Sequence, residues 1–170
     1  SRRVLRAGGA IPLGASAGRS WERGRFEGPH LRDALIDAGV FVETLETASS
    51  YAGINDLYNG VRAALKRATN EGVVMCHVSH AYRDGASLYF TFLTAARSGA
   101  EIEQWHEIKT AACNAIVAGG GTITHHHAVG RDHAPYMPAE IGELGIEVIA
   151  AAKERLDPTG VMNPGNLLPL

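Results

Sequence analysis

The chain has 170 residues, of which 45% are hydrophobic and 20% are charged, a balance typical of a globular domain with a core of its own. A net charge of −2 with scattered basic residues argues against a nucleic-acid-binding protein, which needs a longer basic stripe. Two cysteines without paired spacing argue against a disulfide framework, and no apolar run approaches the ~18–20 residues that span a bilayer.

The N-terminal part of the chain is rich in turn-forming residues. It begins with Ser1 and no initiating Met, from which we expect a fragment of a longer protein. Residues 2–9 are typical of the end of a helix. Residues 8–29 contain six glycines and two prolines, so we predict an irregular lead-in segment over residues 1–29.

The middle of the chain shows alternating helix and strand patterns. Apolar spacing predicts helices and β-branched runs predict strands, and the Asp84-Gly85 pair indicates a hairpin turn. In chain order we predict a helix at 30–38, a strand at 40–45, a helix at 53–68, strands at 73–81 and 87–93, a helix from about 102 to 118 and a short strand at 122–125. From the first strand onward the order is βαββαβ, which predicts an α+β domain of ferredoxin-like type over residues 30–128. Residues 129–170 should add a helix at 139–156 and a tail of turn formers.

Three adjacent histidines, His125, His126 and His127, are the most unusual feature. On an extended backbone His125 and His127 face one way and His126 the other. Three neighbours on such a backbone cannot all reach one ion, so we expect no metal site. A structural cluster stays open as an alternative. The interpretation that we favour is a polar active site, in which imidazoles carry protons or orient other groups.

Two further side chains are candidates for chemistry. Tyr89 shares a strand face with Ser87 and Thr91, away from the apolar residues between them. It could act as a base only beside a group that takes its proton, because a free phenol ionises near pH 10. Arg32, near the start of a helix, is either a solvated residue or a guanidinium that binds a carboxylate or phosphate.

The sequence contains no GxGxxG fingerprint and no phosphate-binding loop of the GxxxxGK type. It therefore shows no loop of its own that would bind the phosphates of a dinucleotide cofactor.

Several segments resemble, in order, the C-terminal part of the alkyldihydroxyacetonephosphate synthases, a family of vanillyl-alcohol-oxidase-type flavoproteins. These segments are Leu31-Arg32-Asp33, Glu43 to Thr47, Tyr82 to Phe90, Gly120 to His127 and the tail from Asp157 to Leu168. Three positions differ: Tyr51 stands for a Trp, Ala128 for a Gly, and His80 has no counterpart that we can place.

The resemblance implies a function. The chain would be a cap domain whose C-terminal helix and tail return to an N-terminal FAD-binding domain of the same protein. The reaction implied is exchange of the acyl group of acyl-dihydroxyacetone phosphate for a long-chain alcohol, with FAD as a covalent trap and no net redox. Arg32 would bind the leaving fatty acid, and Tyr89, His125, His126 and His127 would be catalytic. His126, His127 and Asn163 would also contact the cofactor, and the isolated fragment would be inactive.

Other interpretations stay open. One is a FAD-linked oxidase or dehydrogenase of 2-hydroxy acids such as D-lactate or glycolate, whose tail resembles the Asp157–Asn166 segment of this chain. Another is a stand-alone ferredoxin-like module that binds an anion or a metal. We expect a cytoplasmic protein without nucleic-acid partners that meets membranes through a lipid substrate, and a homodimer is left open.

Overall fold

The computed structural model describes residues 2–168, and the chain divides into two units, one before Gly39 and one from Gly39 onward. The first unit contains α1 (Arg2–Ala7), α2 (Ser16–Gly24) and α3 (Gly28–Asp37). The prediction of an irregular segment is wrong at α2. Glycines and a proline flank this helix, but its interior holds good helix formers such as Arg19 and Glu22. Just after the helix, the Arg25 guanidinium lies 4.7 Å from the ring centre of Phe26.

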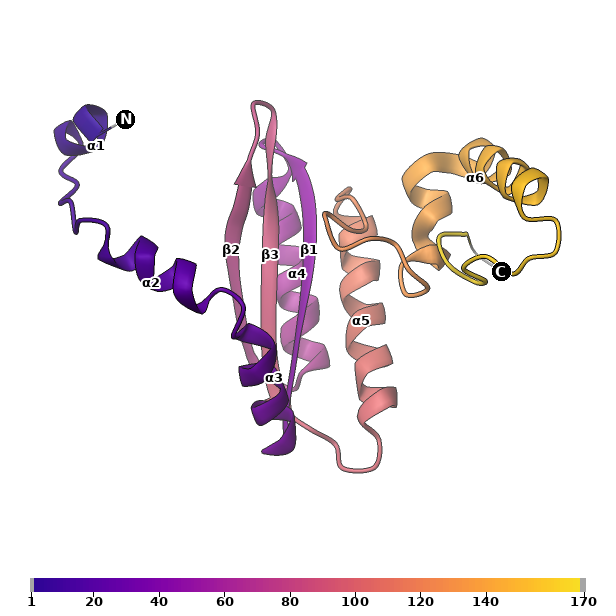
Figure 1. Ribbon diagram of the computed structural model, residues 1–170, viewed down its shortest axis with the longest axis horizontal. Helices are drawn as coiled ribbons and strands as arrows, with labels where there is room; N and C mark the ends of the chain where they lie inside the picture. The colour runs from indigo at the N-terminus through magenta and orange to yellow at the C-terminus, as the bar shows by residue number, and fades with distance from the viewer. Residues whose placement is uncertain (1, 169–170) are drawn as a thin grey trace. The chain divides into compact units, whose positions relative to one another are not determined.

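The second unit contains the predicted helices and hairpin (Figure 1). Its elements are β1 (Val40–Ser50), α4 (Ile54–Ala68), β2 (Val73–Ala81), β3 (Gly85–Ala95), α5 (Glu101–Ala118), a 3₁₀ turn (Ala134–Tyr136) and α6 (Met137–Leu156). β1 is longer than predicted, because the strand continues through the polar run from Glu46 to Ser50.

Within the described residues, β1, β3 and β2 form one antiparallel sheet in that order. The strand predicted at residues 122–125 is absent, because Gly120 and His126 on either side adopt positive φ angles of 65° and 61°. The segment still lies along the outer edge of β1. The amides of Thr122 and His125 donate to the carbonyls of Ala48 and Glu46 at 3.0 and 3.1 Å. It takes the place of a fourth strand, and the α+β class and the ferredoxin-like description are confirmed.

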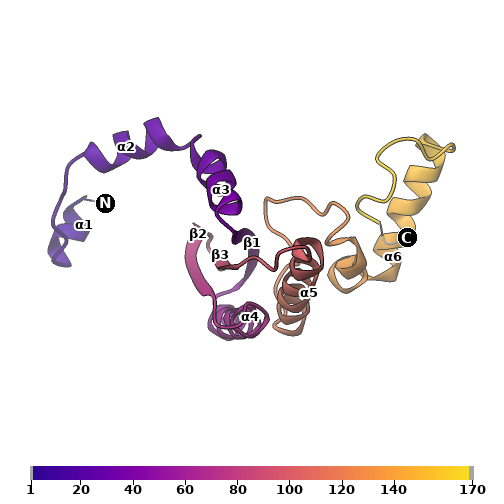
Figure 2. The same cartoon turned by 90° about the horizontal axis from the view of Figure 1, so that it is seen from below.

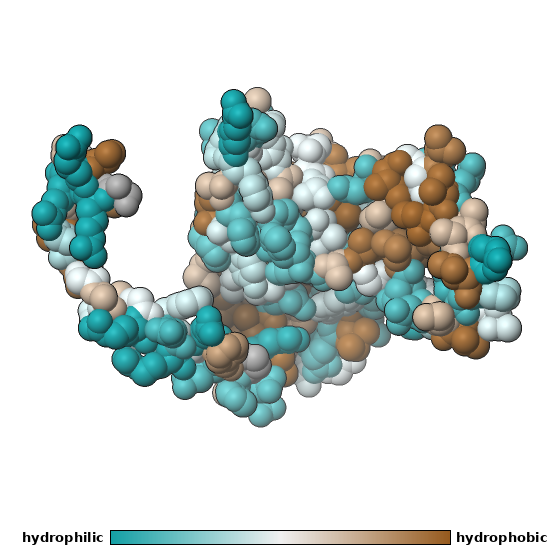
Figure 3. Space-filling view, turned by 45° about the horizontal axis from the view of Figure 1, so that its top comes forward, coloured by the Kyte–Doolittle hydropathy of each residue, from teal (hydrophilic) through white to brown (hydrophobic). Residues whose placement is uncertain are grey.

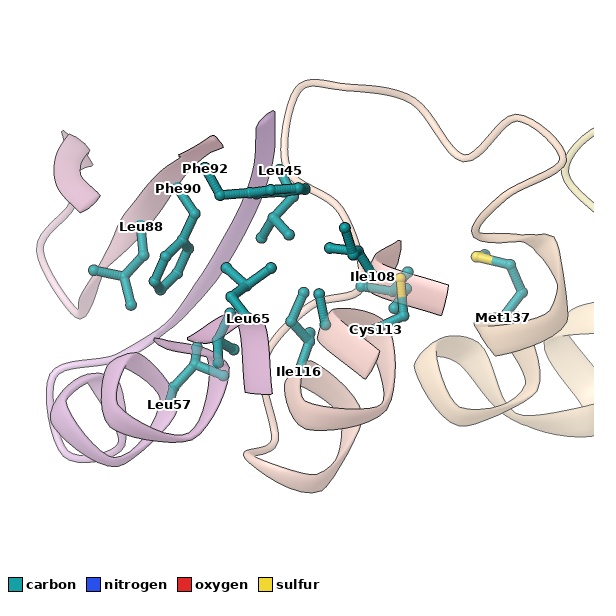
Figure 4. Packing of buried hydrophobic residues seen from close by; sticks show 13 residues of the cluster. Leu45, Leu57, Leu65, Leu88, Phe90, Phe92, Ile108, Cys113, Ile116 and Met137 are labelled. Atoms are coloured by element: carbon teal, nitrogen blue, oxygen red, sulfur yellow. The ribbon is translucent and has the colours of Figure 1, made fainter. Parts of the chain in front are cut away.

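The helices α4 and α5 lie on one side of the sheet, where the core is formed (Figures 2 and 4). Leu88, Phe90 and Phe92 alternate along β3 toward these helices, and Phe90 and Phe92 are fully buried. They meet the apolar faces of α4 and α5. The core residues of α4 and α5 are Leu57, Val61, Leu65, Ile108, Ala112, Cys113 and Ile116. The opposite face of the sheet is therefore free to carry polar side chains.

Two glycines permit close approaches beside that polar face. A Cβ at Gly85 would lie 2.2 Å from the carbonyl oxygen of Ser49, so a side chain there would push β3 away from β1. A Cβ at Gly121 would lie 2.7 Å from the hydroxyl of Thr47, in the segment that leads into the histidines. Both positions need glycine because the neighbouring chain leaves no room.

The C-terminal region forms a bent helix and an anchored tail. Gly142, at φ 72°, interrupts α6. The carboxylate of Asp157 then accepts the amides of Val161 and Met162 at 3.0 and 2.9 Å and pairs with Lys153 at 2.7 Å. The Lys153 ammonium and these amides lower the pKa of Asp157. The turn-rich motif that begins at Asp157 thus encodes a capped loop.

Apolar side chains are exposed along this region, and they form a brown surface over α6 and the tail in Figure 3. The exposed residues are Ile141, Leu144, Val148, Leu156, Val161, Met162 and Leu167. Among the described helices, none combines the length and apolar character that crossing a membrane requires.

Candidate active site

A row of three polar side chains crosses the free face of the sheet. Tyr89 of β3 pairs with Glu46 of β1 on one side and with His77 of β2 on the other. Because side chains alternate along a strand, all three point away from α4 and α5. The prediction that Tyr89 faces away from its apolar neighbours is confirmed: Leu88 and Phe90 are buried in the core, and Tyr89 is only half-buried.

Glu46 lies at the centre of the site, with only 3% of its side chain exposed. Its Oε1 accepts a hydrogen bond from the Ser79 hydroxyl and lies 3.2 Å from Nδ1 of His125, while its Oε2 lies 3.4 Å from Nε2 of His127. Burial raises the pKa of this carboxyl, but hydrogen bonds from Ser79, His125 and Ser87 outweigh burial and lower it. Glu46 is therefore a buried carboxylate held by hydroxyl and imidazole donors.

A bulge in β2 brings two consecutive residues to this carboxylate. The pairing of β2 with β3 shifts between Val78 and Ala81, so alternation is broken at Ser79 and His80. Nδ1 of His80 lies 3.5 Å from Oε1 of Glu46, and the backbone amide of His80 donates to the Ser87 hydroxyl at 2.9 Å. His80, which had no counterpart in the sequence comparison, thus belongs to the site.

The three adjacent histidines do not lie on an extended backbone. His126 and Ala128 have φ angles of 61° and 62°, so the chain turns sharply within the triplet. His125 and His127 nevertheless face the same way, as predicted, and they reach the two oxygens of the Glu46 carboxylate. The expectation of no metal site assumed an extended backbone. Because the backbone turns here, that reason no longer excludes a metal ion.

His126 turns toward the hairpin. Its ring centre lies 4.6 Å from that of His80 and 4.1 Å from that of His125. The hydroxyl of Tyr82 lies between the two neighbouring histidines, 3.0 Å from Nε2 of His125 and 3.5 Å from Nε2 of His126. Tyr51 fixes the hairpin, because its hydroxyl donates to the carbonyl of Tyr82 at 2.8 Å.

Tyr89 lies between two imidazoles. Its ring stacks on His77 with centroids 5.1 Å apart and meets His127 edge-on at 5.3 Å. The predicted neighbourhood of Tyr89 and the histidine triplet is therefore present. A cavity of about 470 Å³ opens beside His127, and Trp105, Lys109 and His133 also line it. Space for a small molecule thus adjoins the imidazole that contacts Tyr89.

The other predicted residues lie elsewhere in the chain. Arg32 belongs to α3 of the first unit, where its side chain is exposed, and its role at the site stays a prediction. Asn163 is exposed in the tail at φ 44°, and its carbonyl accepts the amide of Asn166 at 3.3 Å. The tail reaches back to the loop after the histidines, where Arg131 donates to the carbonyl of Pro164 at 3.1 Å.

Sequence reasoning missed Glu46 and His80. Glu46 has the spacing of an ordinary solvent-facing strand residue, and no local pattern shows that the histidine segment covers it. His80 depends on a bulge. A signal for Glu46 existed in the segment from Glu46 to Ser50, where only Ala48 is apolar. Polar side chains at buried positions of a strand require hydrogen-bond partners.

The backbone at Ala128 yields a stability prediction. An alanine at φ 62° is strained, whereas glycine adopts this conformation freely, so Ala128→Gly should raise the free energy of unfolding by about 1 kcal/mol. Chemical denaturation checks this. The same change at Ala111, inside α5, should lower the free energy of unfolding by about 1 kcal/mol. A loss of stability in both variants would show that Ala128 is unstrained.

Comparison with known proteins finds a matching family and several relatives. The family model described as "FAD linked oxidases, C-terminal domain" matches residues 13–167. The chain is similar to the alkyldihydroxyacetonephosphate synthases of Dictyostelium discoideum and Trypanosoma brucei brucei, at 32% and 31% identity over 98% of its residues, and it spans 28% of the length of each. A solved structure of alkyldihydroxyacetonephosphate synthase superposes with a TM-score of 0.62 at 25% identity, covering 95% of this chain and 26% of that one.

Proposed function

We propose, since this chain belongs to the FAD-linked oxidase family and carries its C-terminal domain, that it forms the substrate-binding part of an alkyldihydroxyacetonephosphate synthase. The proposed reaction replaces the acyl group of acyl-dihydroxyacetone phosphate by a long-chain alcohol. The bond between carbon and the acyl oxygen breaks, a carbon–oxygen bond to the alcohol forms, and a fatty acid leaves. The observation that carries the proposal is the contact of Tyr89 with His127, which Glu46 holds from behind.

The residues of the free sheet face suit a flavin. His126 and His127 are exposed at the rim of the cluster, and imidazole N–H groups can donate to the carbonyls and nitrogens of an isoalloxazine ring. Asn163 offers an amide from the tail. FAD, when bound, supplies an electrophilic ring that can hold the substrate carbon during the exchange. The rest of FAD would be bound outside this chain, whose sequence lacks a phosphate loop.

Tyr89 is the proposed base. The reaction requires removal of a proton next to the ketone of dihydroxyacetone phosphate, and a phenolate formed at Tyr89 can accept it. His127 can accept the proton that Tyr89 first gives up. The Glu46 carboxylate, 3.4 Å from Nε2 of His127, stabilises the positive charge of the imidazolium that forms. The cavity beside His127 offers the Lys109 ammonium to an anionic phosphate.

Arg32 is the proposed partner of the leaving acid. A guanidinium binds a carboxylate through two parallel hydrogen bonds and stabilises the charge that develops as the fatty acid departs. The exposed side chain of Arg32 is available for such a contact.

The apolar surface over α6 and the tail is the proposed contact with the FAD-binding part of the protein. Seven exposed large apolar residues on α6 and the tail favour a protein interface. The relatives are more than three times as long as this chain, which supports a separate flavin-binding domain as the occupant. We propose that the free sheet face and this surface together close the active site.

The test is an assay of the whole protein with acyl-dihydroxyacetone phosphate and a long-chain alcohol. We expect an ether product, one fatty acid released per ether, and no consumption of oxygen. An oxidase of 2-hydroxy acids on the same scaffold would instead lose its yellow colour when D-lactate or glycolate is added without oxygen. That rival is weaker, because relatives that match over 98% of this chain are synthases. Bleaching by a 2-hydroxy acid without ether formation would contradict the proposal.

A further inference from the structure

Three imidazoles converge at the hairpin end of the site, and the proposed reaction gives a role to only one of them, His126. One nitrogen from each of His80, His125 and His126 lies within 4.8 Å of those of the other two. Two of the three side chains are exposed, so an ion from solvent can reach them. We propose that these histidines form a binding site for a borderline divalent cation such as Zn²⁺.

The distances are close to those that zinc requires. With a Zn–N bond of about 2.1 Å, tetrahedral ligand nitrogens lie ~3.4 Å apart, so the imidazoles must approach one another by roughly an ångström. The side chain of His80 is 48% exposed and can make this adjustment without disturbing the core. The positive φ of His126 has already turned its ring toward His80, at 4.6 Å between centres.

The Nδ1 atoms of two ligands are held by groups behind them. Nδ1 of His125 lies 3.2 Å and Nδ1 of His80 lies 3.5 Å from Oε1 of Glu46. A carboxylate that holds one nitrogen of an imidazole leaves the other free for a metal and strengthens it as a ligand. The buried Glu46 would thus serve both histidines, and its negative charge would favour a cation next to it.

The donor set also indicates the class of metal. Neutral imidazoles suit zinc, copper, nickel and iron, whereas calcium and magnesium prefer sites built of oxygen ligands. The hydroxyl of Tyr82, at 3.0 and 3.5 Å from Nε2 of His125 and His126, lies where a fourth ligand or a metal-bound water would be oriented. Three histidines with one further position match the ligand number of zinc.

The experiment measures metal binding by the whole protein, so it needs no turnover and is independent of the proposed synthase reaction. Protein treated with a chelator is dialysed against Zn²⁺, and bound zinc is counted by mass spectrometry. Co²⁺ in place of Zn²⁺ reports the geometry through its visible absorption. We expect one equivalent per chain and the intense spectrum of tetrahedral cobalt.

Variants assign the ligands. His80→Ala and His126→Ala should each weaken zinc binding at least tenfold, and Glu46→Gln, which removes no ligand, should weaken it about 10–100-fold. His106→Ala removes an exposed imidazole from α5 and should leave the affinity unchanged. The proposal is overturned if the unaltered protein binds less than one equivalent, or if His80→Ala and His106→Ala bind zinc equally well. Circular dichroism of each variant verifies the fold.

Discussion

Tyr89→Phe should reduce the turnover of the whole protein by about 10²–10⁴-fold, the range that a general base contributes. Phenylalanine preserves the ring that stacks on His77 at 5.1 Å and meets His127 at 5.3 Å, and it removes only the hydroxyl. The substitution should therefore leave the free energy of unfolding and the amount of bound FAD unchanged. Steady-state kinetics, chemical denaturation and the flavin absorbance of the purified variant measure these three quantities separately.

Tyr58→Phe is the matched control. Tyr58 lies on α4, where its ring stacks on Phe90 at 6.1 Å on the helix-covered side of the sheet. Loss of its hydroxyl should leave turnover within a factor of about two, which corresponds to about 0.4 kcal/mol of activation free energy. Equal turnover in Tyr89→Phe and in the unaltered protein would remove Tyr89 from the mechanism.

The second large effect is expected at Glu46. Glu46→Gln keeps the shape of the side chain but loses the charge that holds the imidazoles of His125 and His127. We expect the free energy of unfolding to fall by about 1–3 kcal/mol, because the donors around this buried position lose a charged acceptor. Turnover should fall by about 10²-fold, since His127 would no longer be held against Tyr89. Denaturation curves and steady-state kinetics check both values.

Two controls separate positioning from stability. Glu43→Gln makes the same change three residues earlier on β1, where the carboxylate accepts the indole N–H of Trp105 at 3.1 Å, and it should affect neither property strongly. Ile116→Val removes one methylene from the core and should cost about 1 kcal/mol while turnover stays normal. If a core variant of equal stability lost as much activity as Glu46→Gln, the positioning role would be wrong.

Local sequence patterns were sufficient to predict most helices and strands of the second unit. Alternation along residues 87–93 placed Tyr89 opposite the core, and the Asp84-Gly85 pair placed the hairpin, because both features depend on neighbouring residues alone. Apolar spacing likewise predicted α4 and α5. These elements carry their own signal, since one face of each must be buried.

The features that the sequence did not predict depend on contacts between residues far apart in the chain. The segment at Thr122 has the composition of a strand, yet it forms only isolated hydrogen bonds with β1, because the turn at His126 ends it. Glu46 and His125 are 79 residues apart, and no local pattern indicates that they meet. Arg32 belongs to the first unit, whereas the other residues of the site belong to the second. Its role there is therefore proposed from the resemblance alone.

The extra residue in β2 has a consequence for how this site can vary. Residues before Val78 keep a regular pairing with β3, so the row that contains Tyr89 does not depend on the irregularity. Beyond it, Ser79 and His80 both point to the carboxylate, and the hairpin carries Tyr82 toward His125. Deleting one residue there would restore strict alternation and turn the hairpin's side chains to the other side of the ribbon. One insertion or deletion would thus add His80 to this site or remove it in the course of evolution, while Tyr89 and its neighbour His77 stay in place.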